Sequence, residues 1–260
     1  MERVIAGIDV GSTKICTLIG RVAENGDVLH VVGMGVTPAR GVHRGVVTDI
    51  DQAARCIGES VQRAMRMAGL PITEAYVSVG GSHIGSQKGH GPVSIGHADR
   101  LVDRDDIARV IEAAEAIALP HNRRILHTIP REYIVDGQRG IRNPLGMMGY
   151  RLEVETHIVT AADTALQNLR RCVELNQIDV LDLVLQPLAS AEAVLTDEER
   201  NMGVMLVDIG GGTTDVAIYA RGSVWSTSVY PLAGYHITND IGMLLHTPFA
   251  AAEDAKIRYA

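Results

Sequence analysis

The alternation of apolar runs and polar breaks along the chain predicts a mixed α/β protein. Residues 3–9, 14–21 and 28–36 are apolar enough for strands, and Asn25-Gly26 between the last two is a hairpin signal. Apolar positions then recur every three to four residues, which predicts a helix from Asp49 to Gly69. The chain therefore opens with three antiparallel strands followed by a helix.

The same alternation continues to the end of the chain. Further strands are predicted at residues 75–79, 125–129, 133–135, 152–159, 180–185, 204–208 and 214–219. Further helices are predicted at residues 104–118, 164–175, 187–195 and 236–245, and from residue 248 onward. Polar, glycine-rich residues 80–96 predict a passage between domains, residues 139–150 an exposed loop, and residues 196–201 a charged turn.

The two ends of this chain share one pattern. An apolar strand ends in Asp9 and a turn of Gly, Ser and Thr, and a similar order recurs at Asp208, 199 positions later. A lone turn of this composition is common and carries little information about function. Two copies, each leading into a second and a third strand, predict two similar lobes that face each other.

Both turns have the composition of a phosphate-binding loop. Glycine lets backbone amides approach an anion closely, while hydroxyl groups and Lys14 add donors and positive charge. The glycines and hydroxyl residues concerned are Gly11, Ser12, Thr13, Gly210, Gly211, Gly212, Thr213 and Thr214. Asp9 and Asp208, at the strand ends, are suited to hold Mg²⁺ through its waters. We therefore predict that the two hairpins bind the β- and γ-phosphates of one nucleotide from opposite sides of a cleft.

Three other residues each allow two interpretations. Gln186 follows a predicted buried strand, where it suits a water-orienting role at a γ-phosphate and an ordinary strand-end amide equally well. Glu253 and Lys256 share one face of a helix. They either contact a ribose and base or form a solvated ion pair, and the pair taken alone favours the second interpretation.

Composition narrows the class of function. A formal net charge of −7 and an aromatic content of 3% argue against nucleic acid as a partner. The three cysteines are widely spaced, and neither a signal peptide nor a long apolar span is found, so a cytoplasmic location is expected. Three histidines lie in or next to the glycine-rich stretch: His83, His90 and His97. We expect their side chains to be exposed rather than to form a metal site.

Several segments resemble known families. Residues 207–219 look like the phosphate-2 motif of the actin, Hsp70 and hexokinase superfamily, residues 7–15 resemble phosphate-1, and residues 186–190 resemble connect-1. More narrowly, the chain resembles the FtsA family of bacterial cell-division proteins. The segments that carry this narrower resemblance are residues 41–47, 188–195, 234–241 and 252–259.

The resemblance implies an actin-like α/β fold with ribonuclease-H-type lobes of β-hairpins and helices. In this interpretation residues 1–80 and 161–202 form subdomain 1A, residues 81–160 form an inserted α+β (SHS2-like) 1C subdomain, and residues 203–260 begin subdomain 2A. Family members continue with a second adenosine motif, subdomain 2B and a lipid-binding amphipathic helix. The second lobe is therefore expected to be incomplete, and this length of chain is expected to bind Mg-ATP weakly or not at all.

The resemblance also implies a function. FtsA-family proteins are ATP-binding scaffolds with at most weak ATPase activity. They bind FtsZ, polymerise with themselves, recruit later division proteins through 1C, and attach peripherally to the cytoplasmic side of the cell membrane at the division site. The nucleotide-binding residues implied here are Asp9, Gly11, Ser12, Thr13, Lys14, Asp208, Gly210, Gly211, Gly212, Thr213, Thr214, Gly234, Glu253 and Lys256.

Two other functions are compatible with the same superfamily. The actin-like PilM adaptors of type IV pilus assembly share the architecture and a related insertion. A sugar kinase would need a base at an acceptor hydroxyl and a sugar pocket. The sequence offers no convincing candidate for either, which favours the adaptor.

Overall fold

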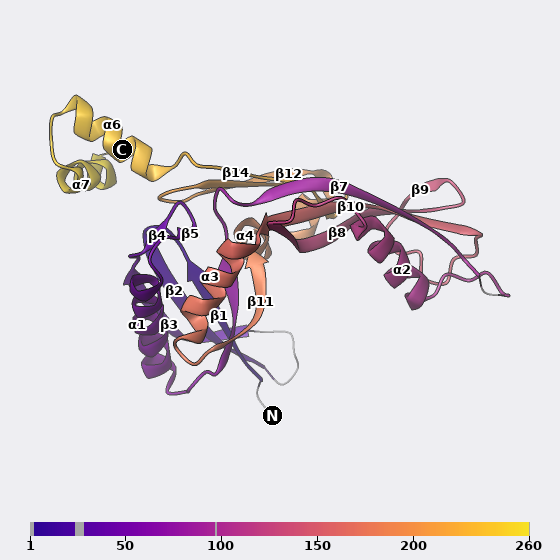
Figure 1. The fold of residues 1–260 in the computed structure, drawn as a ribbon, viewed down its shortest axis with the longest axis horizontal. Helices are drawn as coiled ribbons and strands as arrows, with labels where there is room; N and C mark the ends of the chain where they lie inside the picture. The colour runs from indigo at the N-terminus through magenta and orange to yellow at the C-terminus, as the bar shows by residue number, and fades with distance from the viewer. Residues whose placement is uncertain (1–2, 24–28, 97, 260) are drawn as a thin grey trace.

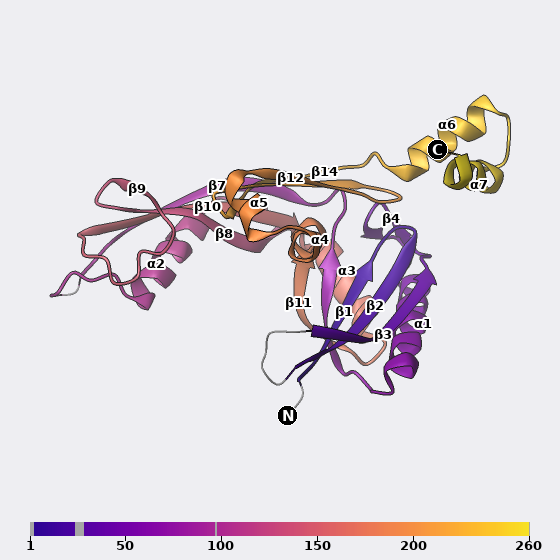
Figure 2. The same ribbon diagram turned by 180° about the vertical axis from the view of Figure 1, so that it is seen from behind.

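The computed structural model describes residues 3–23, 29–96 and 98–259 as three blocks of secondary structure along an extended molecule (Figures 1 and 2). The predicted hairpin signal Asn25-Gly26 and His97 lie outside the described residues. The mixed α/β class predicted from the hydrophobic pattern is confirmed, because each of the three blocks contains both strands and helices.

The first block is a five-stranded mixed sheet. Its strands, in spatial order, are β11 (Asp179–Leu185), β6 (Glu74–Val79), β1 (Arg3–Val10), β2 (Lys14–Val22) and β3 (Leu29–Pro38). β1, β2 and β3 pair antiparallel, whereas β6 runs parallel to both β1 and β11. Helices α1 (Ile50–Ala68) and α3 (Asp163–Glu174) contribute to the same hydrophobic core, and the short strands β4 (Val42–His43) and β5 (Val46–Val47) precede α1.

Helix α1 begins and ends where the sequence predicts. The Asp49 carboxylate accepts a hydrogen bond from the amide of Gln52, and Gly69 adopts a left-handed conformation at the C-terminus of the helix. The helix lies so close to β3 that a Cβ on Gly35 would meet the carbonyl oxygen of Ser60 at 1.9 Å. Glycine at this position is what allows α1 to pack directly on the strand.

The second block is a four-stranded antiparallel sheet with one helix. Its strands, in spatial order, are β7 (Gly85–Ser94), β10 (Arg151–Ala162), β8 (Arg123–Val135) and β9 (Gln138–Ile141), and the helix is α2 (Arg104–Glu115). Residues 125–129 and 133–135, predicted as separate strands, belong to one strand, and β9 overlaps the start of the predicted loop at 139–150.

The polar stretch at residues 80–96 was predicted as a passage between domains. In the structure it contains the strand β7, which the prediction did not include. A Cβ on Gly89 would meet the carbonyl oxygen of Ala114 at 2.7 Å, and one on Gly91 would meet the Ala114 amide nitrogen at 2.4 Å. The glycines therefore serve close strand–helix packing rather than flexibility. His90 is exposed as predicted, but His83 is partly buried, and burial lowers the pKa of His83 to about 4.

The third block begins with α4 (Gln186–Val194) and α5 (Asp197–Met202) and continues with a three-stranded antiparallel sheet. The strands are β12 (Val204–Ile209), β13 (Thr214–Ala220) and β14 (Ser223–Tyr230), followed by α6 (Gly234–Leu244) and α7 (Phe249–Tyr259). The predicted charged turn at 196–201 is the helix α5, because Thr196 and Glu199 form a capping box at its start.

Strand β14 connects the third block to the second. Its residue Thr227 shares a 2.8 Å hydrogen bond with the ring of His157 on β10 and accepts, at its carbonyl oxygen, a 3.0 Å hydrogen bond from the Ser86 hydroxyl on β7. The hydroxyl of Ser223 donates to the Pro130 carbonyl on β8. The small sheet that carries the second glycine-rich turn therefore lies against the four-stranded sheet of the second block (Figure 1).

Candidate functional site

The two glycine-rich turns have the same internal geometry. In the first, the amide of Gly11 donates to the carbonyl of Lys14 over 3.1 Å, and in the second the amide of Gly210 donates to the carbonyl of Thr213 over 2.9 Å. Each glycine stands two residues after the aspartate that is the last but one residue of its strand. The repeat seen in the sequence is thus a repeat of backbone structure. The amides of Gly11 and Gly210 already donate hydrogen bonds within their own turns. The groups that would bind an anion therefore belong to the residues that follow these glycines.

The two turns contact each other and line one cavity. A Cβ on Gly211 would lie 2.1 Å from the Thr13 side chain, and a Cβ on Gly212 would lie 2.8 Å from the Ser12 hydroxyl. The Tyr235 hydroxyl adds a hydrogen bond to the Ser12 carbonyl. The absence of side chains on these glycines is therefore what allows the turns of separate sheets to come together.

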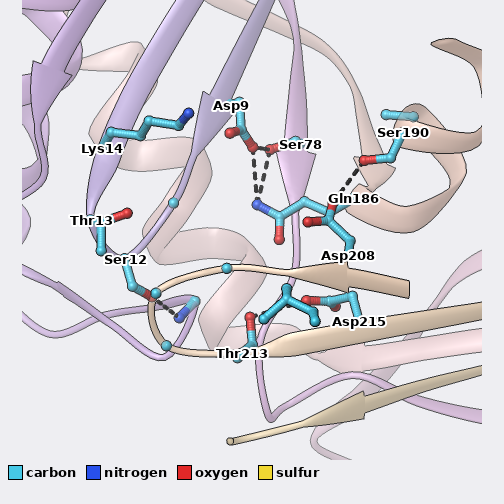
Figure 3. Close-up of a pocket in the computed structure, with 17 residues that line it drawn as sticks. Asp9, Ser12, Thr13, Lys14, Ser78, Gln186, Ser190, Asp208, Thr213 and Asp215 are labelled. Carbon is cyan, nitrogen blue, oxygen red and sulfur yellow. Dashed lines mark hydrogen bonds between the residues drawn. The ribbon is translucent and has the colours of Figure 1, made fainter. Parts of the chain in front are cut away.

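The cavity has a volume of about 420 Å³ (Figure 3). The residues that line it are Asp9, Gly11, Ser12, Thr13, Lys14, Gly45, Ser78, Gln186, Ala189, Ser190, Asp208, Ile209, Gly210, Gly211, Gly212, Thr213 and Asp215. They come from strand ends and turns of the five-stranded and three-stranded sheets, from the turn between β4 and β5, and from α4. Asp9 and Asp208, far apart in sequence, share this one crevice.

Hydrogen bonds orient the first two carboxylates. Asp9 accepts from the Ser78 hydroxyl at the end of β6 and, over 3.0 Å, from the side-chain amide of Gln186. Asp208 accepts from the Ser190 hydroxyl on α4 over 2.8 Å. Figure 3 shows these bonds grouped on one side of the cavity. Helix α4 thus contacts a carboxylate of each turn.

A third carboxylate, that of Asp215, lies beside them. Its side chain accepts a 3.0 Å hydrogen bond from the Thr213 hydroxyl, and only 3% of the residue is exposed. Burial, reinforced by the negative charges of Asp208 and Asp9 and partly offset by the Thr213 hydrogen bond, raises the pKa of Asp215 to about 6.

This arrangement suits a hydrated cation. Within the described ranges, no three His, Cys, Asp or Glu side chains come together closely enough to hold a metal ion directly. Mg²⁺ retains several of its waters in protein sites, and carboxylates can hold it through them. Asp9 and Asp208 therefore fit the predicted magnesium contacts in their chemistry.

Four of the predicted nucleotide-binding residues lie outside the cavity lining. The Thr214 hydroxyl donates to the Leu232 carbonyl over 2.6 Å, and the Gly234 amide donates to the Gly210 carbonyl over 3.1 Å. Glu253 and Lys256 form an ion pair of 2.7 Å on α7. The ammonium group of Lys256 also donates to the Gly234 carbonyl, which places the pair beside the second turn. Contact of these residues with a ribose or base stays a prediction.

Sequence reasoning did not assign Ser78, Ser190, Asp215 or Gly45 to the site. Ser190 and Asp215 stand within the connect-1 and phosphate-2 segments, so the motifs themselves carried a signal for them. Gly45 stands within residues 41–47, one of the segments that resemble FtsA, whereas Ser78 reaches the site through tertiary structure alone. The amide of Gly45 donates to the Ser12 hydroxyl over 2.9 Å.

Comparison with solved structures defines the class of protein. The fold resembles the PilM–PilN type IV pilus biogenesis complex with a TM-score of 0.73 and 16% identity, over 98% of this chain and 69% of that one. It also resembles MreB5 of Spiroplasma citri bound to AMPPNP, with a TM-score of 0.50 and 14% identity, over 98% of this chain and 62% of that one. A family model described as the SHS2 domain inserted in FtsA matches residues 81–160. The protein therefore has the predicted actin-like α/β fold with an SHS2 insertion.

Sequence comparison identifies the family. A model of the cell division protein FtsA matches residues 205–260. The chain is 47% identical over 258 residues to the cell division protein FtsA of Pseudomonas aeruginosa. This match covers 99% of this chain and 61% of the relative. The chain belongs to the FtsA family. It spans about three fifths of the length of the curated relatives it matches, and its likeness to PilM, at 16% identity, concerns the fold alone.

Proposed function

We propose that this chain binds ATP with magnesium between its two turns and serves as an actin-like adaptor in bacterial cell division. The observation that carries the nucleotide part is the pair of equivalent turns, with their carboxylates, around one cavity. The fold is shared with an MreB5 structure described as bound to AMPPNP, which supports a nucleotide as the ligand.

The charge of the cavity supports a metal-bound nucleotide over a bare one. Of the described residues that line it, three carry carboxylates, and Lys14 supplies the single cationic side chain. A polyphosphate is itself multiply negative, so these carboxylates would repel it unless a cation came with it. When bound, Mg²⁺ would supply this neutralising charge, with Asp9 and Asp208 holding it through water.

A scaffold with slow ATP turnover is the best-supported role for this site. The Gln186 amide, which was predicted either to orient a water or to be an ordinary strand-end group, donates to Asp9 and lines the cavity. These contacts are compatible with a water-positioning role. We propose at most weak ATPase activity, with bound nucleotide serving mainly to hold the two lobes together.

The adaptor role follows from family membership. We propose that the protein binds FtsZ, associates with further FtsA copies and brings later division proteins to the ring through the SHS2 insertion at residues 81–160. We place it peripherally on the cytoplasmic side of the membrane at the division site. Across the described ranges, no helix is both long and apolar enough to span a bilayer.

Calorimetric titration with Mg-ATP tests the nucleotide part. We expect weak, saturable binding to one site, and a loss of about 10- to 100-fold in affinity for Asp208→Ala, because a carboxylate oriented toward the metal is removed. Asp240→Ala, an exposed position on α6, is the matched control and should bind like the wild type. Equal affinity of the wild type and Asp208→Ala would contradict the assignment.

The same wild-type protein, sedimented with FtsZ filaments, tests the adaptor part. We expect it to pellet with the filaments in proportion to their concentration. A chain that stays in the supernatant at every FtsZ concentration would remove FtsZ as a direct partner of these 260 residues, whatever the titration with nucleotide gives.

A further inference from the structure

Tyr235, the second residue of α6, contacts both glycine-rich turns from outside the cavity lining. Its backbone amide donates a 2.8 Å hydrogen bond to the Gly211 carbonyl of the second turn. Its hydroxyl donates a 3.2 Å hydrogen bond to the Ser12 carbonyl of the first turn. One residue therefore connects two turns that belong to separate sheets.

Each of these hydrogen bonds fixes the direction of a backbone amide. A peptide unit is planar, and in its trans form the carbonyl and the amide hydrogen point to opposite sides. The Ser12 carbonyl shares its plane with the Thr13 amide, and the Gly211 carbonyl shares its plane with the Gly212 amide; both units are trans. Thr13 and Gly212 both line the cavity. The hydroxyl of Tyr235 thus orients an amide of the first turn, and its backbone orients an amide of the second.

The start of α6 is itself held in place. The Gly234 carbonyl lies in the same peptide plane as the Tyr235 amide. It accepts a 2.9 Å hydrogen bond from the Thr238 hydroxyl and a 3.3 Å hydrogen bond from the Lys256 ammonium group on α7. The backbone from which Tyr235 reaches both turns is therefore fixed by α6 and α7 together.

The ring of Tyr235 is fixed by a contact of its own. It packs edge-to-face against Phe249, the first residue of α7, with 5.7 Å between the ring centroids. Burial, reinforced by the negative charge of Glu253, raises the pKa of the Tyr235 hydroxyl. The hydroxyl therefore stays protonated at neutral pH and can donate. Because the ring and the hydroxyl have different partners, one contact can be removed without the other.

We infer that Tyr235 is a positioning residue of the nucleotide site, which orients one phosphate-binding amide in each turn without touching the nucleotide. This inference rests on the proposed function. Backbone amides bind an anion best when they point at it before it arrives, because ordering them on binding costs free energy. Loss of the Tyr235 hydroxyl should therefore weaken nucleotide binding, although every residue that lines the cavity is unchanged.

Calorimetric titration with Mg-ATP gives the first test. Tyr235→Phe removes the hydroxyl but keeps the ring contact with Phe249 and the backbone contact with Gly211. A hydrogen bond of 3.2 Å is long for a hydroxyl donor, so we expect a moderate loss of affinity, about 2- to 5-fold. Tyr259→Phe is the same change at an exposed position on α7 and should bind like the wild type.

The amide signals of Thr13 and Gly212 in NMR spectra of the ligand-free protein separate positioning from a structural role. Tyr235→Phe loses its contact with the first turn alone, so the Thr13 signal should shift while the Gly212 signal keeps its wild-type position. A substitution that loosened the start of α6 would move both signals, because the backbone of residue 235 would then leave the second turn as well.

The outcomes distinguish the inference from the proposed function. If the wild type binds Mg-ATP and Tyr235→Phe binds it equally well, or if the Thr13 signal does not move, the inference is wrong and the nucleotide site stands. Movement of both amide signals would overturn the inference in favour of a structural role. If the wild type does not bind Mg-ATP, the proposed function fails and the inference fails with it.

Discussion

At the scale of single residues, buried polar groups connect the site to the rest of the molecule. His157 is 3% exposed, shares a hydrogen bond with Thr227, and lies where the inserted sheet meets the sheet of the second turn. Burial, with a smaller contribution from the positive charge of Arg131, lowers the pKa of His157 from 6.5 to about 4. The imidazole is therefore neutral in the folded protein at neutral pH.

This depressed pKa predicts a loss of stability in mild acid. Between pH 6.5 and pH 4 the unfolded chain binds a proton at His157 that the folded chain does not, so stability falls as the pH drops through this window. When the pH falls from 7 to 5, the free energy of unfolding of the wild type should decrease by about 2 kcal/mol more than that of His157→Gln, as measured by urea unfolding. His121→Gln, at an exposed position, should follow the wild type. Equal acid sensitivity of wild type and His157→Gln would contradict the assignment.

The site residues that could be predicted from the sequence are those that belong to the repeated pattern. Asp9 and Asp208 and the glycines after them stand out because one local pattern occurs twice. Ser78 reaches Asp9 only because the parallel pairing of β1 with β6 brings residues 69 positions apart together. No local pattern in the sequence encodes that contact.

At the scale of elements, one prediction succeeded and another failed, for different physical reasons. Helix α1 was predicted within a residue or two because its caps and apolar spacing agree. Strand β7 was missed because its glycines and polar residues read as a loop. In the structure Gly89 and Gly91 let α2 approach the strand, and this role is visible only once the helix is in place.

The packing of α1 on β3 gives a prediction with an internal control. A methyl group at Gly35 would meet the Ser60 carbonyl oxygen at 1.9 Å and the Ala64 amide nitrogen at 2.8 Å. Gly35→Ala should therefore reduce the free energy of unfolding by about 2–3 kcal/mol, because the helix must move away from the strand. Gly7→Ala, in the same sheet with no atom within 4 Å of the added group, should change stability by less than about 0.5 kcal/mol. Similar losses for both variants in denaturant titration would contradict this account of the packing.

At the scale of the whole molecule, the two turns belong to separate sheets and line one cavity. Strand β14 of the three-stranded sheet contacts the inserted subdomain. That the two turns share one cavity was predictable from the repeat. The contact of β14 with the inserted sheet was not, because it depends on single polar pairs such as Ser223 with Pro130, 93 positions apart. Such pairs leave no periodic signal in the sequence.

Hydrogen exchange, followed by mass spectrometry across a titration with Mg-ATP, tests most directly whether both turns hold one nucleotide. Peptides that cover residues 11–14 and 210–213 should slow their exchange together, with one shared midpoint, because both turns line the same cavity. Peptides from α2, which lies in the inserted subdomain, provide the internal reference. Protection of one turn without the other, or of the two at different ATP concentrations, would contradict the account.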